Sequence, residues 1–161
     1  KGTALADNPS LTTRLWKGKN PVRIVIDKNL ELPADFNLMD DKAQTIIINN
    51  IKETVEGNRT YCKVYERDNL ADDIVRILYR HNISSVIVEG GARLLHSFLQ
   101  AGLWDEARVI TNRELVIGDG ISVSFNQQQE LVKRISYMTD DICYYLNTGK
   151  QDFKNINIEI T

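Results

Sequence analysis

The segment SSVIVEGGARLLHSFLQAG, residues 84–102, decides the fold class because its hydrophobic pattern changes abruptly in the middle. The first six residues are mainly branched and apolar, which predicts a strand over 84–89. Apolar side chains then recur at helical spacing over 92–101, and Gly102 suits the end of a helix. A strand and a helix in direct succession are typical of an α/β protein.

The rest of the chain continues this alternation. Runs of branched and aromatic residues predict further strands, over 21–27, 44–50, 60–66, 104–111, 130–138 and 141–147. Apolar spacing after Asn69, a favourable capping residue, predicts another helix. Residues 2–21 are rich in turn formers and show no periodicity. We therefore expect a mixed sheet with parallel strands and crossover helices in its middle, and a C-terminal antiparallel hairpin that turns at Asp140–Asp141.

The composition is that of an ordinary globular protein, with 161 residues, 42% of them hydrophobic and 26% charged. The net charge of −2 gives no sign of a nucleic-acid or anionic-membrane binder. No apolar stretch approaches the roughly 20 residues that cross a bilayer, and the N-terminus lacks the apolar core of a signal peptide. Cys62 and Cys143 have no metal-ligand spacing around them, so a reduced, cytoplasmic location and no metal site are expected.

The Glu89-Gly90-Gly91 junction suits either an anion-binding site or a plain turn. Glycines without a Cβ atom can adopt positive φ and let a ligand approach the backbone, and the free N–H groups of the following helix favour a phosphate. Arg93 in the first helical turn opposes the helix dipole, a cost that a bound anion would offset. The same glycines also suit a plain tight turn with Glu89 as a solvated strand end, so the pattern alone leaves both readings open.

Four segments in a fixed order carry a resemblance to a known family. They are GTALADNPSLTTR (2–14), PVRIVID (21–27), VEGGARLLHSFLQAGLWDE (88–106) and IGDG (117–120). Over residues 2 to about 149 the chain resembles the C-terminal reductase domain of the bacterial bifunctional riboflavin-biosynthesis deaminase/reductase. The resemblance implies a dihydrofolate-reductase-like, three-layer α/β/α fold, with a central mixed, mostly parallel sheet and an antiparallel C-terminal hairpin.

The resemblance also implies an activity. Members of this family use NADPH to reduce the ribosyl group of 5-amino-6-(5-phosphoribosylamino)uracil to a ribityl chain. Two alternatives stay open. One is a related reductase of a pterin, a folate or another ribosylaminopyrimidine, and the other is a non-catalytic partner or dimerisation domain.

The resemblance assigns roles residue by residue. Thr3 and Asp7 match positions that contact the cofactor, and Leu11, Arg14 and Glu89 match positions that contact the substrate. The segment expected to hold the NADPH pyrophosphate comprises Gly91, Ala92, Arg93, Leu94, Leu95, His96 and Ser97. No proton donor is identified, so the catalytic residue stays unassigned.

The chain also departs from the family. Lys28 stands after the strand where the family often has a small hydroxyl residue, and we expect Lys28 to meet the 2′-phosphate of NADPH. Residues 1–149 are expected to be a reductase domain without its upstream strand and helix, with a zinc deaminase domain further upstream in the full-length protein. Family members are commonly homodimers, so a homodimer is expected. The alternating isoleucines of residues 150–161 allow an extra edge strand.

Overall fold

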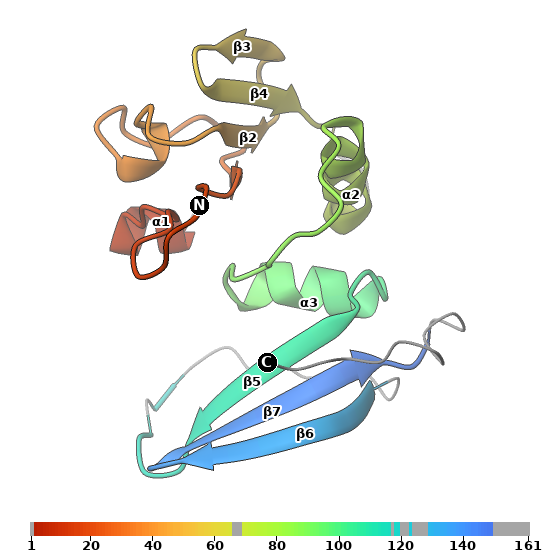
Figure 1. The fold of residues 1–161 in the computed structure, drawn as a ribbon. Coiled ribbons are helices and arrows are strands. Elements are labelled where there is room, and N and C mark those ends of the chain that lie inside the picture. Colours follow the sequence, from red (N-terminus) through yellow and green to blue (C-terminus); the bar gives the residue numbers. More distant parts are fainter. Residues whose placement is uncertain (1, 66–68, 117, 120–122, 124–128, 150–161) are drawn as a thin grey trace. The chain divides into compact units, whose positions relative to one another are not determined.

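The chain forms two compact units, residues 1–91 and 92–161, in the computed structural model shown in Figure 1. The structure describes residues 2–65, 69–116, 118–119, 123 and 129–149. In this part of the chain each unit contains one sheet. The tail 150–161, whose sequence allows an edge strand, lies outside the described residues.

The sheet of the first unit is mixed and mostly parallel. Its strands are β1 (Arg23–Ile26), β2 (Thr45–Asn49), β3 (Thr54–Glu56) and β4 (Arg59–Lys63). Their order is β1-β2-β4-β3, in which β1, β2 and β4 run parallel and β3 pairs antiparallel with β4. Gly57, with φ of 58°, lies in the short turn between β3 and β4. The expected strands at 21–27 and 44–50 are confirmed, and so is the one at 60–66 as far as the structure describes it, since residue 66 lies outside the described residues. Strand β3 was not expected.

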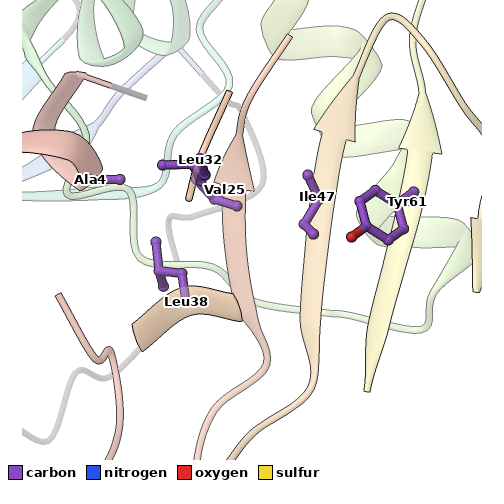
Figure 2. Packing of buried hydrophobic residues seen from close by; sticks show 6 residues of the cluster. All are labelled: Ala4, Val25, Leu32, Leu38, Ile47 and Tyr61. Carbon is purple, nitrogen blue, oxygen red and sulfur yellow. The ribbon is translucent and has the colours of Figure 1, made fainter. Parts of the chain in front are cut away.

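Both faces of this sheet are covered, as the apolar runs in β1 and β2 require. On one face Val25, Ile47 and Tyr61 pack with residues outside the sheet, namely Ala4, Leu32 and Leu38 (Figure 2). Side chains alternate along a strand, so Cys62 points to the opposite face from Tyr61. There its Sγ lies 3.4 Å from Nε2 of His81, which follows helix α2 (Leu70–Arg80). Helix α2 therefore lies on that second face.

Helix α2 begins where the sequence predicted. The side chain of Asn69 accepts a hydrogen bond from the backbone N–H of Asp72, which satisfies a donor that has no partner within the helix. The buried residues share one stripe at helical spacing: Ala71, Ile74, Ile77 and Leu78. Burial of this stripe is what keeps so short a helix folded.

The N-terminal segment corrects one expectation. Residues Gly2–Asp7 form helix α1, in a region that lacked any periodic pattern. A helix of 6 residues is too short to display a repeat, and its stability comes from packing, since Ala4 is buried in the core cluster. A 3-10 turn, η1 (Asn37–Met39), also forms beside this core, with Leu38 buried.

The expected strand over 84–89 is wrong. Residues 83–91 belong to neither sheet, and Val86 and Ile87 are 42% and 84% exposed. A strand requires a neighbouring strand to satisfy its backbone groups, and neither sheet pairs with this segment. The apolar pattern indicates that these side chains favour burial, but it does not indicate whether a neighbouring strand is available. Gly90 and Gly91 therefore precede a helix without following a strand.

The second unit combines helix α3 (Ala92–Gln100) with three antiparallel strands. These are β5 (Glu106–Asn112), β6 (Gln129–Tyr137) and β7 (Asp140–Asn147), in the order β5-β7-β6. The predicted helix is confirmed, with Phe98 and Leu99 buried and Gly102 at a φ of 65° after its end. At the end of β7, Asn147 Nδ2 donates to the carbonyl oxygens of Gly102 (3.2 Å) and Trp104 (2.9 Å).

The hairpin of β6 and β7 turns two residues earlier than expected. Tyr137 pairs with Asp140, so the turn consists of Met138 and Thr139, and Met138 has φ of 52°. The aspartates lie instead in the ladder. Asp140 Oδ1 accepts a hydrogen bond from Asn112 Nδ2 at 2.7 Å, and Asp141 Oδ1 accepts one from Ser136 Oγ at 2.6 Å.

Candidate cofactor and substrate site

Two of the predicted cofactor residues, far apart in the sequence, are neighbours in the first unit. Thr3 lies exposed in α1, and a Cβ atom placed on Gly91 would lie 3.8 Å from Thr3 Oγ1. Asp7, also exposed, ends the same helix. The packing of α1 through Ala4 therefore holds the Thr3 hydroxyl beside the backbone of Gly91.

Gly91 is not required by the fold of the chain itself. Its φ lies outside the positive range, so the expected use of a left-handed conformation is not seen there. The 3.8 Å separation from Thr3 Oγ1 is an ordinary van der Waals contact, so the chain would accept a methyl group at this position. The space beside Gly91 is therefore available to a ligand that approaches the backbone closely.

The expected substrate residues of the first unit lie on the segment that follows α1. Leu11 has φ of 46° and Arg14 is exposed. Within the described part of the chain, no carboxylate forms an ion pair with the Arg14 guanidinium. Glu89, also exposed, lies in the irregular segment before Gly91. Arg14 thus offers a planar set of donors that suits a phosphate group.

The carboxyl ends of β1 and β2 form one edge of the sheet, the edge where open α/β sheets bind ligands. Lys28 is exposed at this edge, and its carbonyl oxygen accepts a hydrogen bond from Asn50 N at 2.9 Å. Asp27 is 1% exposed, and its Oδ2 accepts from Leu32 N at 2.8 Å. Asp27 Oδ1 and Asn50 Oδ1 are buried without a donor among the residues that the structure describes. Lys28 therefore presents an exposed cation just after the end of β1.

Arg23 was not among the residues predicted from the sequence, yet its side chain forms an extensive hydrogen-bond network within the described part of the first unit. Arg23 is 1% exposed, and its Nε donates to Thr45 Oγ1 at 2.9 Å. The guanidinium also donates to Asp40 Oδ1 at 2.8 Å, and this hydrogen bond lowers the pKa of the Asp40 carboxyl. A charged residue inside the apolar run PVRIVID was the available signal, because a buried arginine must be paired.

The remaining predicted cofactor residues lie on α3, in the second unit. Arg93 and His96 are exposed, whereas Ala92, Leu94, Leu95 and Ser97 are half-buried. Ser97 Oγ donates to the carbonyl oxygen of Arg93 at 3.0 Å. The first turn of α3 contains no acidic side chain, so no residue there complements the positive end of the helix dipole. The first backbone N–H groups of α3, which have no partner within the helix, suit an anion.

Metal-ligand clusters and membrane-spanning helices are both absent from the described ranges. No three or more His, Cys, Asp or Glu side chains lie together as metal ligands there. The same ranges contain no helix both long and apolar enough to span a bilayer. Burial raises the pKa of the Cys62 thiol, so this cysteine stays protonated at neutral pH.

Comparison with known proteins establishes the family. The sequence model described as the RibD C-terminal domain matches residues 1–142. The chain belongs to the RibD C-terminal domain family. This confirms the resemblance drawn from the four sequence segments, and the α/β fold class agrees with solved structures of the family.

Two relatives illustrate the similarity. The 2,5-diamino-6-ribosylamino-4(3H)-pyrimidinone 5′-phosphate reductase of Aquifex aeolicus is 34% identical over 127 residues, which cover 74% of this chain and 57% of that protein. The riboflavin biosynthesis protein RibD of Bacillus amyloliquefaciens is 37% identical over 114 residues, covering 65% of this chain and 31% of that protein. The chain thus spans about half or less of the length of these relatives.

Two solved structures share the fold of this chain. A diaminohydroxyphosphoribosylaminopyrimidine deaminase/5-amino-6-(5-phosphoribosylamino)uracil reductase from Thermotoga maritima has a TM-score of 0.76 and 26% identity, over 91% of this chain and 43% of that one. The riboflavin biosynthesis reductase Rib7 of Saccharomyces cerevisiae has a TM-score of 0.74 over 91% of this chain and 72% of that one. Its 23% identity supports the shared fold alone.

Proposed function

We propose that this RibD-type domain reduces the ribosyl group of 5-amino-6-(5-phosphoribosylamino)uracil to a ribityl chain with NADPH. The observation that carries the proposal is the proximity of Thr3 to Gly91. These two residues are far apart in the sequence, both are expected to contact the cofactor, and the fold itself does not require a glycine at position 91. Membership of the RibD C-terminal domain family and relatives that are named as reductases support it.

The cofactor contacts follow from the donors that the chain presents. When bound, the nicotinamide supplies a hydride to the sugar carbon, and the protein binds and orients the two reactants. The Thr3 hydroxyl and the Asp7 carboxylate contact the cofactor beside Gly91. The pyrophosphate is held by the segment Gly91, Ala92, Arg93, Leu94, Leu95, His96 and Ser97, through backbone N–H groups and the Arg93 guanidinium.

The substrate contacts are divided by charge. The Arg14 guanidinium binds the ribose phosphate through paired hydrogen bonds, and Leu11 packs against the substrate close to this phosphate. The Glu89 carboxylate accepts hydrogen bonds from ribose hydroxyls or from the pyrimidine. A cation at one end of the substrate and a carboxylate at the other fix the direction in which it binds.

A second substrate has support of its own. Relatives from Aquifex aeolicus, Methanothermobacter thermautotrophicus and Archaeoglobus fulgidus are named for the 2,5-diamino-6-ribosylamino-4(3H)-pyrimidinone 5′-phosphate, which still carries the amino group that deamination removes. Turnover of both compounds by the same preparation separates the two: the substrate with the larger kcat/KM is the native one.

Partners and location belong to the same proposal. The chain acts as a homodimer in the cytoplasm, and in the full-length protein a zinc deaminase domain precedes it. The greater length of the RibD relatives supports the extra domain.

Gly91→Ala tests the cofactor site directly. NADPH binding, followed by the change in its fluorescence, is expected to weaken about tenfold, because the new methyl group displaces a charged phosphate from the backbone N–H groups. The free energy of unfolding should not fall, since the methyl group meets Thr3 Oγ1 at 3.8 Å. A parent chain that binds no NADPH, or a variant that binds it equally well, would contradict the proposed site.

Lys28→Ala tests the choice between NADPH and NADH. Removing the ammonium group is expected to weaken the binding of NADPH several-fold and to leave the binding of NADH unchanged, because only NADPH carries the 2′-phosphate. Lys42→Ala, at another exposed lysine of the first unit, is the control. Equal losses for both cofactors would exclude a role of Lys28 at the 2′-phosphate.

A further inference from the structure

The segment that carries Arg14 has an unfavourable backbone that must be held in place. Asn8 and Leu11 have φ of 40° and 46°, in the left-handed region. For a leucine this conformation persists only where surrounding contacts fix it. The exposure of Leu11, Arg14, Leu15 and Trp16 shows that apolar burial does not supply those contacts.

The first set of contacts is a pair of hydrogen bonds between two asparagines. Asn37 N donates to Asn8 Oδ1, and Asn37 Nδ2 donates to the carbonyl oxygen of Asn8, both at 2.8 Å. The two bonds close a ring between the end of α1 and η1. This ring fixes Asn8 at the position where the chain leaves α1 toward Arg14.

The second set lies on the other side of Leu11. Asn20 Oδ1 accepts a hydrogen bond from Thr13 N at 3.1 Å, and Asn20 Nδ2 donates to the carbonyl oxygen of Lys42 at 3.1 Å. Thr13 Oγ1 donates to the carbonyl oxygen of Lys19 at 3.1 Å. The residue directly before Arg14 is therefore tied through one amide side chain to the strand connection at Lys42.

Both sets of hydrogen bonds involve the 37–43 connection, which the buried Arg23 side chain holds in place. Arg23 donates from Nη1 to the carbonyl oxygen of Asn37 at 2.7 Å and, more weakly, to that of Ser10 at 3.4 Å. Its Nη2 donates to the carbonyl oxygens of Asp40 (2.8 Å) and Ala43 (2.9 Å). The guanidinium thus holds the 37–43 connection, on which Asn37 and Lys42 lie.

We propose that Asn20 and Asn37 are positioning residues that fix the backbone beneath Arg14, and thereby the affinity of the enzyme for the phosphate of its substrate. The inference rests on the proposed function, because it takes Arg14 as the phosphate-binding residue. Neither asparagine contacts the substrate. Each removes backbone freedom that phosphate binding would otherwise have to restrict.

The test compares Asn20→Ala, Asn37→Ala and a matched control, Asn58→Ala. Asn58 Nδ2 donates to the carbonyl oxygen of Asp41 at 2.8 Å, so the control also loses one amide contact to the same connection, yet it has no tie to the Arg14 segment. Each variant is assayed with the phosphorylated substrate and with its dephosphorylated form. Asn20→Asp is a conservative variant that keeps the acceptor for Thr13 N.

We expect Asn20→Ala and Asn37→Ala to raise KM for the phosphorylated substrate at least about fivefold. The KM for the dephosphorylated form, kcat and NADPH affinity should stay unchanged, and Asn20→Asp should recover part of the loss. The control should match the parent. The inference is overturned if KM rises equally for both substrates, or if the two variants behave like Asn58→Ala. A parent chain that reduces neither substrate would instead refute the proposed function.

Discussion

Replacing Arg23 by methionine is expected to lower the free energy of unfolding of the first unit by about 3 kcal/mol. Methionine fills much of the same volume, so the loss measures hydrogen bonds and charge instead of a cavity. The variant leaves the carbonyl oxygens of Asn37 and Ala43 without their buried donor. Asp40 loses its paired cation but remains partly exposed, so water replaces part of that interaction.

Urea unfolding followed by circular dichroism measures this effect. Thr45→Val is the control, because it removes the acceptor of Arg23 Nε at 2.9 Å and only one weaker hydrogen bond besides, from Thr45 Oγ1 to the carbonyl oxygen of Ala43 at 3.4 Å. This variant should cost about 1 kcal/mol. A loss for Arg23→Met no larger than that of Thr45→Val would show that the guanidinium network does not support the first unit.

Arg14→Ala is expected to raise KM for the phosphorylated substrate by about 10- to 100-fold, because hydrogen bonds to a charged partner contribute about 1.5–3 kcal/mol. The KM of Arg14→Lys should lie between those of the alanine variant and the parent, since lysine keeps the charge but lacks the planar pair of donors. The measurement is steady-state kinetics with varied substrate at saturating NADPH.

Two comparisons make this result specific. KM for the dephosphorylated substrate should not change in Arg14→Ala, because that substrate has no phosphate to lose. Arg76→Ala, at an exposed arginine of α2, should match the parent for both substrates. If Arg14→Ala raised KM equally for both, Arg14 would not be the phosphate-binding residue.

The features that could be predicted are those that depend on neighbours in the sequence. Asn69 and the apolar spacing that follows it predict α2, and the apolar run of β2 predicts burial on both faces of the sheet. The quoted segments also led to the correct family. The role assignments that came with it stay predictions.

The features that could not be predicted depend on distant residues. Helix α1 forms because Ala4 packs with Val25 and Ile47, which no local pattern announces. The 84–89 segment looked like a strand because its composition carries no information about a partner strand. The ties of Asn20 to Lys42 and of Asn37 to Asn8 join loops whose approach is decided by the fold.

The proposed function depends on hydride transfer from NADPH to the sugar carbon of a phosphorylated ribosylaminopyrimidine. The most direct measurement uses NADPH that carries deuterium at the transferred position of the nicotinamide, with mass spectrometry of the product. We expect a ribityl product that contains one deuterium at the former C1 of the ribose. A folded chain that binds both NADPH and the substrate, yet forms no deuterated ribityl product, would contradict the proposed function.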